Sequence, residues 1–183
     1  MVRRKRKVKK DERLYLYLLL FFSLSLILAL IIYISWLKLE LPIAFFPQVS
    51  TAGFKEVSIG LDIEEDRGIV KFYSDCYELR MVVDRSQAIS IARGQNNIRY
   101  FRPLTHDLAD DILKNYGIKI LMVKITELKN NTYFARLILR QGNKVLSLDS
   151  RPSDALALAA RTDYLVPVYV KEELFEKYGT KIC

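Results

Sequence analysis

A run of residues without a charge, from Leu14 to Leu37, constrains the fold of this 183-residue chain more than any other feature. The run consists mostly of Leu, Ile, Phe and Ala, and about 20 such residues in a helix are enough to cross a bilayer. Aromatic rings near its two ends, at Tyr15 and Trp36, stand where the membrane interfaces would lie. The sequence therefore predicts a transmembrane helix over residues 14–37.

This apolar run allows two interpretations, a cleaved signal peptide or a retained anchor. A signal peptide has an apolar core of about 7 to 15 residues followed by small residues at a cleavage site. Here the core is longer and "LKLELPIAFFPQ" follows, so we expect an anchor. Residues 1–13 hold eight basic residues, whereas Lys38 is the only basic residue close behind the run. The positive-inside rule then predicts a cytoplasmic N-terminus, with everything after residue 37 on the extracytoplasmic side.

The basic balance of the chain arises mainly from that N-terminal tail. The net charge is +8, and residues 1–13, with eight basic and two acidic residues, contribute six of these charges. The remaining 170 residues therefore carry only +2. A basic surface that binds nucleic acid should lie on the folded domain, so the basic pI indicates membrane topology more than nucleic-acid binding.

The two cysteines, Cys76 and Cys183, have no metal-ligand spacing. An oxidising exterior would allow them to form a disulfide. The alternative is a buried Cys76 and a free thiol at the C-terminal Cys183. From the sequence alone we favour this unpaired alternative.

Hydrophobic periodicity divides the rest of the chain into a linker over residues 38–53 and a domain over residues 54–183. Alternating apolar residues predict three strands between residues 57 and 83, in a meander, and apolar β-branched runs predict three more between 118 and 149. A short strand, "VPVYV", and four helices complete the pattern, the first helix with Asp84 as N-cap, Gln87 in a capping box and Gly94 at its end. Because strands and helices come in blocks, we expect an α+β domain with a mixed, mostly antiparallel sheet and helices packed on it.

Two segments of this domain share a pattern of Arg-Pro, a hydroxyl residue, Asp and an apolar helix: "RPLTHDL" at 102–108 and "SRPSDALALAAR" at 150–161. A structural interpretation assigns the prolines to helix starts and the aspartates to first turns, beside the positive end of each helix dipole. In this interpretation Thr105 caps one helix and Ser150 or Ser153 caps the other.

A functional interpretation begins with the two arginines, Arg102 and Arg151, which helix capping does not require. If the motifs lie side by side, arginines bind a phosphate, the His106 imidazole moves a proton, and carboxylates hold a divalent cation or activate water. The candidate catalytic residues are His106, Asp107, Asp149 and Asp154; the candidate substrate-binding residues are Arg102, Thr105, Arg151 and Ser153; and the candidate ligands of Mg²⁺ or another divalent cation are Asp107, Asp149 and Asp154.

These motifs, with the hairpin segment "NNTYFARL" between them, closely resemble the bifunctional nuclease domain family over residues 57–178. The resemblance implies an α+β fold, self-association into homo-oligomers, and activity on DNA and RNA. One departure lies upstream, where "VVDRSQA" places Gln87 at a position that the family tends to fill with glutamate. A glutamine can hydrogen bond but cannot ionise or serve as a base.

Two functions are therefore open. The first is a membrane-anchored nuclease that hydrolyses phosphodiester bonds in RNA, DNA or both, which the two complete motifs favour. The second is a non-catalytic membrane-tethered binding or assembly module that keeps the nuclease-family fold. The near-neutral domain and Gln87 favour this second function.

Overall fold

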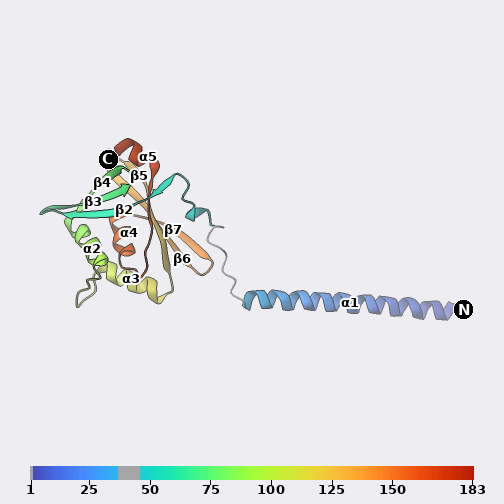
Figure 1. The fold of residues 1–183 in the computed structure, drawn as a ribbon. Helices are drawn as coiled ribbons and strands as arrows, with labels where there is room; N and C mark the ends of the chain where they lie inside the picture. Colours follow the sequence, from blue (N-terminus) through green and yellow to red (C-terminus); the bar gives the residue numbers. More distant parts are fainter. Residues whose placement is uncertain (1, 37–45) are drawn as a thin grey trace. The chain divides into compact units, whose positions relative to one another are not determined.

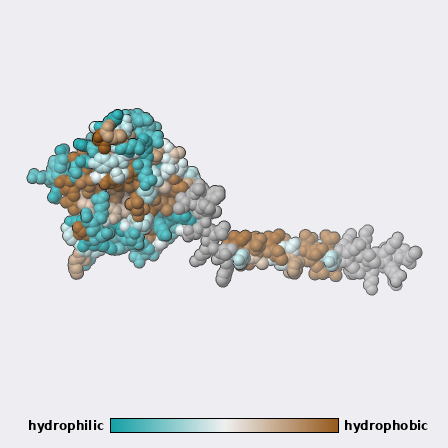
Figure 2. Space-filling view, in the orientation of Figure 1, coloured by the Kyte–Doolittle hydropathy of each residue, from teal (hydrophilic) through white to brown (hydrophobic). Residues whose placement is uncertain are grey.

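The computed structural model describes residues 2–36 and 46–183, which belong to two separate compact units. The first unit contains the helix α1 (Val2–Trp36). Within α1, Leu14–Ser35 is long and apolar enough to cross a membrane, and its exposed apolar surface is seen in Figure 2. Length and composition alone support that statement, and a signal sequence near an N-terminus passes the same test. The last residue of the predicted transmembrane helix, Leu37, and half of the predicted linker, residues 38–45, lie outside the described residues, and a short 3-10 helix, η2 (Pro47–Val49), follows.

The second unit contains nine strands in two sheets (Figure 1). Its elements, in chain order, are β1 (Phe54–Glu56), β2 (Ser58–Ile63), β3 (Arg67–Ser74), β4 (Tyr77–Asp84), α2 (Arg85–Gln95), α3 (Thr105–Asn115), β5 (Lys119–Lys129), β6 (Thr132–Gln141), β7 (Lys144–Ser150), α4 (Pro152–Ala159), β8 (Val168–Lys171), α5 (Glu172–Tyr178) and β9 (Thr180–Lys181). One sheet has the order β1-β8-β5-β6-β7, in which only β5 and β8 are parallel, and the other has the antiparallel order β2-β3-β4-β9. The predicted α+β class with mostly antiparallel strands is confirmed.

The apolar alternation of the strands builds one core that both sheets share. In the smaller sheet Phe72 pairs with Leu79, and both side chains are buried. In the larger sheet Val123 of β5 pairs with Leu137 of β6, and these side chains belong to the same buried cluster. The predicted meander of β2, β3 and β4 is therefore correct, as is the β5-β6-β7 succession.

Helices α2, α3 and α4 gather beside this core and carry the two Arg-Pro motifs (Figure 1). Helix α2 approaches α4 closely at Gly94, where an added Cβ would stand 2.8 Å from the Cβ of Ala160. Gly94 was predicted to end α2, but the helix continues to Gln95, and the glycine instead permits this contact. Asp84 is the N-cap of α2, as predicted, but its side chain makes no capping hydrogen bond, so the predicted capping box is not formed.

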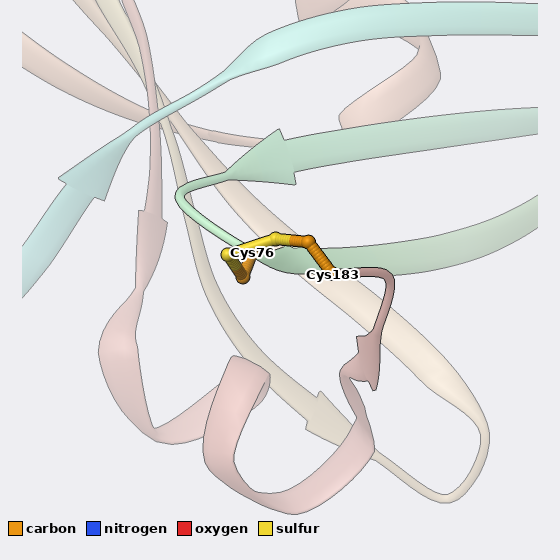
Figure 3. Close-up of a disulfide and its surroundings, with 2 residues drawn as sticks. All are labelled: Cys76 and Cys183. Atoms are coloured by element: carbon orange, nitrogen blue, oxygen red, sulfur yellow. A yellow bond between two sulfur atoms is a disulfide. The ribbon is translucent and has the colours of Figure 1, made fainter.

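A disulfide joins Cys76, between β3 and β4, to Cys183 at the C-terminus (Figure 3). The favoured prediction of unpaired cysteines is therefore wrong. The two residues are 107 positions apart, and antiparallel pairing of β9 with β4 brings them together, with Glu78 opposite Thr180. No spacing in the sequence signals that pairing.

Candidate active site

The structure brings the two Arg-Pro motifs together through His106 and Asp154. His106 lies in the first turn of α3 and Asp154 in the first turn of α4, and His106 Nε2 is 3.3 Å from Asp154 Oδ1. Both side chains are about one-quarter exposed, at 21% and 28%. This contact between residues 48 positions apart places the starts of the two helices side by side in one candidate site.

Arg151 occupies the other side of the Asp154 carboxylate. Its Nε donates to Oδ2 at 2.6 Å and its Nη2 donates to Oδ1 at 3.0 Å, so the pair is bidentate. The hydrogen bonds and charge of Asp154 raise the pKa of Arg151 above its ordinary value. The Arg151 side chain is nevertheless 66% exposed, and a solvent-borne anion can reach it.

Gln87 of α2 completes this side of the pocket. With its amide oriented to satisfy its neighbours, its oxygen accepts from Arg151 Nη1 at 2.8 Å and its nitrogen donates to Ser153 Oγ at 3.1 Å. Gln87 therefore contacts the candidate phosphate-binding arginine directly. Ser153 itself is only 3% exposed, so it supports Gln87 from within the protein.

The inner side of the imidazole contacts Ser90 of α2. Ser90 Oγ lies 2.9 Å from His106 Nδ1 and also accepts a hydrogen bond from Arg161 Nη2 at 3.2 Å. Because a hydroxyl has one proton and two lone pairs, Ser90 can donate to Nδ1 or accept an Nδ1 proton beside its bond from Arg161, according to the tautomer of the ring. The ring is thus held from both sides.

Arg161, which the sequence analysis did not single out, anchors α3 against α2 and α4. Its Nε donates to Asp107 Oδ1 at 2.7 Å, and these side chains are only 6% and 3% exposed. Nη1 donates to the carbonyl oxygens of Ser90 at 3.0 Å and Ala157 at 2.6 Å, and the latter belongs to the last turn of α4. The only signal in the sequence is an arginine closing a helix of small apolar residues.

Asp107 is a buried structural carboxylate in this arrangement. Its Oδ2 accepts the Leu104 N–H at 2.9 Å, so it caps the start of α3. Burial alone raises the pKa of Asp107, but the Arg161 hydrogen bond, the Leu104 N–H and nearby guanidinium charges outweigh burial and lower that pKa below its ordinary value. Asp107 thus stays ionised without facing solvent.

The other predicted caps are wrong. Leu104 is the N-cap of α3, with Thr105 as an exposed first residue, and Arg151 is the N-cap of α4. Neither Thr105 nor Ser153 makes a side-chain capping bond, and the buried Ser150 Oγ has no hydrogen-bond partner among the described residues.

Two further candidates stand apart from the pocket contacts. Arg102 and Asp149 are exposed, and within residues 46–183 neither side chain makes a hydrogen bond or ion pair. The candidate metal ligands Asp107, Asp149 and Asp154 are not assembled, since no group of three or more His, Cys, Asp or Glu side chains in the described part of the chain could hold a metal ion. These residues do not fit a preformed Mg²⁺ site, because Asp107 is buried against Arg161 and Asp154 is bound by Arg151.

Comparison with known proteins places these motifs in a family. An uncharacterized protein of Mycobacterium tuberculosis is 37% identical over 100 residues, which cover 55% of this chain and 58% of that protein. Bifunctional nuclease 1 of Oryza sativa subsp. japonica is 31% identical over 107 residues, covering 57% and 32%, and bifunctional nuclease 2 of Arabidopsis thaliana is 27% identical over 128 residues, covering 68% and 36%. The chain thus spans less than two thirds of the length of each relative.

The family profile described as the bifunctional nuclease domain matches residues 73–182, a segment that contains both motifs and the pocket. Since this match covers more than half of the chain, the protein belongs to the bifunctional nuclease domain family.

Proposed function

We propose that this protein is a nuclease that hydrolyses phosphodiester bonds in RNA, DNA or both. The observation that carries the proposal is the contact of His106 with Asp154, which is itself bound by the exposed Arg151. A guanidinium, an imidazole and a carboxylate in mutual contact provide a phosphate ligand and a proton-transfer pair. The names of the plant relatives support the same chemistry.

In this proposal the substrate phosphate takes over part of the Arg151 guanidinium that Asp154 now occupies. Gln87 stays beside Arg151 and orients it through the 2.8 Å hydrogen bond. In this step the neutral ring carries its proton on Nδ1, donated to Ser90 Oγ, so that Nε2 accepts a proton from the attacking water and then gives it to the leaving oxygen. Nε2 is the nitrogen that can turn to substrate, because its 3.3 Å contact with Asp154 is longer than the 2.9 Å contact of Nδ1 with Ser90.

The buried pair of Asp107 and Arg161 has a positioning role in this mechanism. It fixes the start of α3 and, through Ser90, the plane of the His106 ring. Because the three candidate metal ligands are not assembled, the proposal routes no step through a metal ion. Dependence on Mg²⁺ stays a prediction for the assay.

We further propose that residues 14–37 anchor the chain and that the domain is extracytoplasmic. The apolar segment Leu14–Ser35 and the basic residues before it support the anchor and its orientation. The disulfide between Cys76 and Cys183 independently supports an oxidising compartment.

Self-association into a homo-oligomer is also a proposal. Leu104, Leu108, Ile112 and Tyr116, at intervals of four residues, form a stripe along α3 whose members are between 39% and 69% exposed. An apolar stripe of this kind is suited to an interface.

A specific observation favours the non-catalytic module as a second candidate. The carboxylates of Asp107 and Asp154 are each paired with an arginine, and both ring nitrogens of His106 have partners. In the non-catalytic module, these pairs would have the structural role of joining α2, α3 and α4.

Cleavage of labelled single-stranded RNA and DNA by the purified full chain in detergent micelles separates the two candidates. The assay is run with Mg²⁺, with Mn²⁺ and with EDTA, beside His106→Ala. A nuclease of the proposed kind cleaves the labelled strand, and His106→Ala lowers the cleavage rate by about 10²- to 10⁴-fold, the usual contribution of a general acid–base catalyst. Equal cleavage by a folded His106→Ala variant refutes the assignment, and no cleavage by the folded wild type favours the module.

A further inference from the structure

The loop between α2 and α3, residues 96–104, presents an aromatic ring entirely to solvent. Phe101 is 100% exposed, with Tyr100 at 53% and Ile98 at 52% beside it. Burial of a phenylalanine side chain stabilises a protein by about 1.5–3 kcal/mol, and a completely exposed Phe101 does not provide this stabilisation. In Figure 1 this loop projects from the end of the domain that carries α2 and α3.

The loop is nevertheless held by the two residues that precede the exposed ring, Arg99 and Tyr100. The Arg93 guanidinium stacks over the Tyr100 ring, 3.9 Å from its centroid, and hydrogen bonds to the Tyr100 hydroxyl. Arg99 Nη2 donates to Asp111 Oδ2 at 2.7 Å and to the Asp107 carbonyl at 3.3 Å. Phe101 is therefore presented by a fixed scaffold, which lowers the entropy lost when a ligand binds.

Several charged side chains lie near the start of this loop. A pocket of about 140 Å³ lies under the loop, and its charged lining residues are Arg93, Arg99, Lys114 and Arg161 against Asp107 and Asp110. Three of these cations are in ion pairs, Arg99 with Asp111, Lys114 with Asp110 and Arg161 with Asp107, whereas Arg93 stacks on Tyr100. On the other side of Phe101, Arg102 is exposed and makes no side-chain hydrogen bond or ion pair within residues 46–183.

We infer that the 96–104 loop is a binding subsite for single-stranded nucleic acid, with Phe101 stacking on a base and Arg102 contacting a phosphate. Aromatic rings between arginines are the arrangement that binds unpaired bases and their backbone, at about 1–3 kcal/mol for each stacked base. A duplex hides its base faces in the stack, so the subsite selects single strands. This inference rests on the proposed function, because the proposed nuclease activity identifies the phosphodiester bond that reacts.

The covalent chain limits how far this subsite lies from the candidate pocket. Five residue steps separate Phe101 from His106, and a fully extended chain covers at most about 3.6 Å per residue, or about 18 Å. That length corresponds to about five nucleotides at roughly 3.4 Å each. One short strand can therefore reach the ring and the His106 pocket together.

The test is fluorescence anisotropy of a labelled 12-nucleotide DNA, single-stranded or duplex, with the full chain in detergent micelles and EDTA. Binding is measured in the His106→Ala background, so that cleavage does not interfere. Phe101→Ala should weaken single-strand binding by about 5- to 100-fold, which corresponds to the loss of one stacked base, and should leave duplex binding unchanged. Phe101→Trp should restore it. The basic tail, residues 1–13, is common to all variants and cancels in the comparison.

Tyr178→Ala is the matched control, since Tyr178 is an aromatic residue, 50% exposed, at the end of α5. It should bind like its parent. The inference is overturned if Phe101→Ala binds like its parent, if Tyr178→Ala shows the same loss, or if Phe101→Ala changes only the oligomeric state. Phe101-dependent binding without cleavage by the wild type would refute the proposed nuclease activity and leave this subsite standing.

Discussion

Replacing Arg161 by Met tests whether the buried ion pair with Asp107 holds the pocket together. The substitution leaves a carboxylate that is 3% exposed with the Leu104 N–H as its remaining hydrogen-bond donor, and it removes a donor from the Ala157 carbonyl in the last turn of α4. Breaking one side of a buried ion pair costs about 3–5 kcal/mol. For a domain of this size that corresponds to a fall in Tm of about 10 °C or more.

The loss should depend on pH because it originates in the Asp107 charge. In the wild type the Asp107 pKa is lowered on folding, so its contribution is present above the unfolded value of about 3.9 and disappears as pH falls through the folded value. In the Arg161→Met variant, burial becomes the main influence on Asp107 and raises its folded pKa. Protonation of Asp107 at low pH then removes the unpaired charge, so the variant loses less stability there. The difference in free energy of unfolding between the wild type and Arg161→Met, the stability gap, should therefore narrow as pH falls from 7 towards 4.

Urea unfolding followed by tyrosine near-UV circular dichroism measures this gap, since the only tryptophan, Trp36, lies in the other unit. Asp107→Asn combined with Arg161→Met should recover about 1–2 kcal/mol relative to Arg161→Met, because the unpaired charge is gone. A gap below about 1 kcal/mol at pH 7, or a gap that does not change between pH 7 and 4, would refute the reasoning.

Three further outcomes follow from the disulfide and the pocket. Removing the disulfide with Cys76→Ser and Cys183→Ser should lower the free energy of unfolding by about 4–5 kcal/mol, since the bond closes a loop of 107 residues; urea midpoints that match those of the untreated wild type would contradict this. Gln87→Glu adds a carboxylate beside Arg151, so it should compete with phosphate for the guanidinium and weaken the binding of single-stranded DNA, and an unchanged affinity would argue against Arg151 as a phosphate ligand. Arg151→Gln removes one phosphate contact and should reduce the slope of log affinity against log salt by about 0.7 for single strands; an unaltered slope would show that Arg151 does not contact phosphate.

Local patterns predicted most of the fold correctly because they act within single elements. The burial of β3 alternates along its length, which is the signal that the sequence analysis used. The strands β1 and β9 were not predicted, because they are three and two residues long and exist only through distant partners, as in the pairing of Glu56 with Tyr169. Division of the strands into two sheets likewise depends on contacts between elements.

The candidate site was predictable in composition but not in geometry. The Arg-Pro pattern identified His106 and Asp154, yet their contact arises from the packing of α3 against α4, which one sequence does not contain. Arg161 was missed because an arginine at the end of a helix usually faces solvent and the helix dipole. Here it is buried, and it joins Asp107 to Ser90 behind the imidazole.

A double-mutant cycle on cleavage of single-stranded RNA tests the central claim, that the two motifs form one phosphodiester site, most directly. Rates are measured for His106→Ala, Asp154→Asn and the combined variant, each verified as folded. Residues that act as a unit give a combined loss close to that of the more damaging single change. The account predicts that result. A combined loss equal to the product of the two single losses in rate, or an unchanged rate with Asp154→Asn, would contradict it. The His106–Asp154 contact would then have a structural role only.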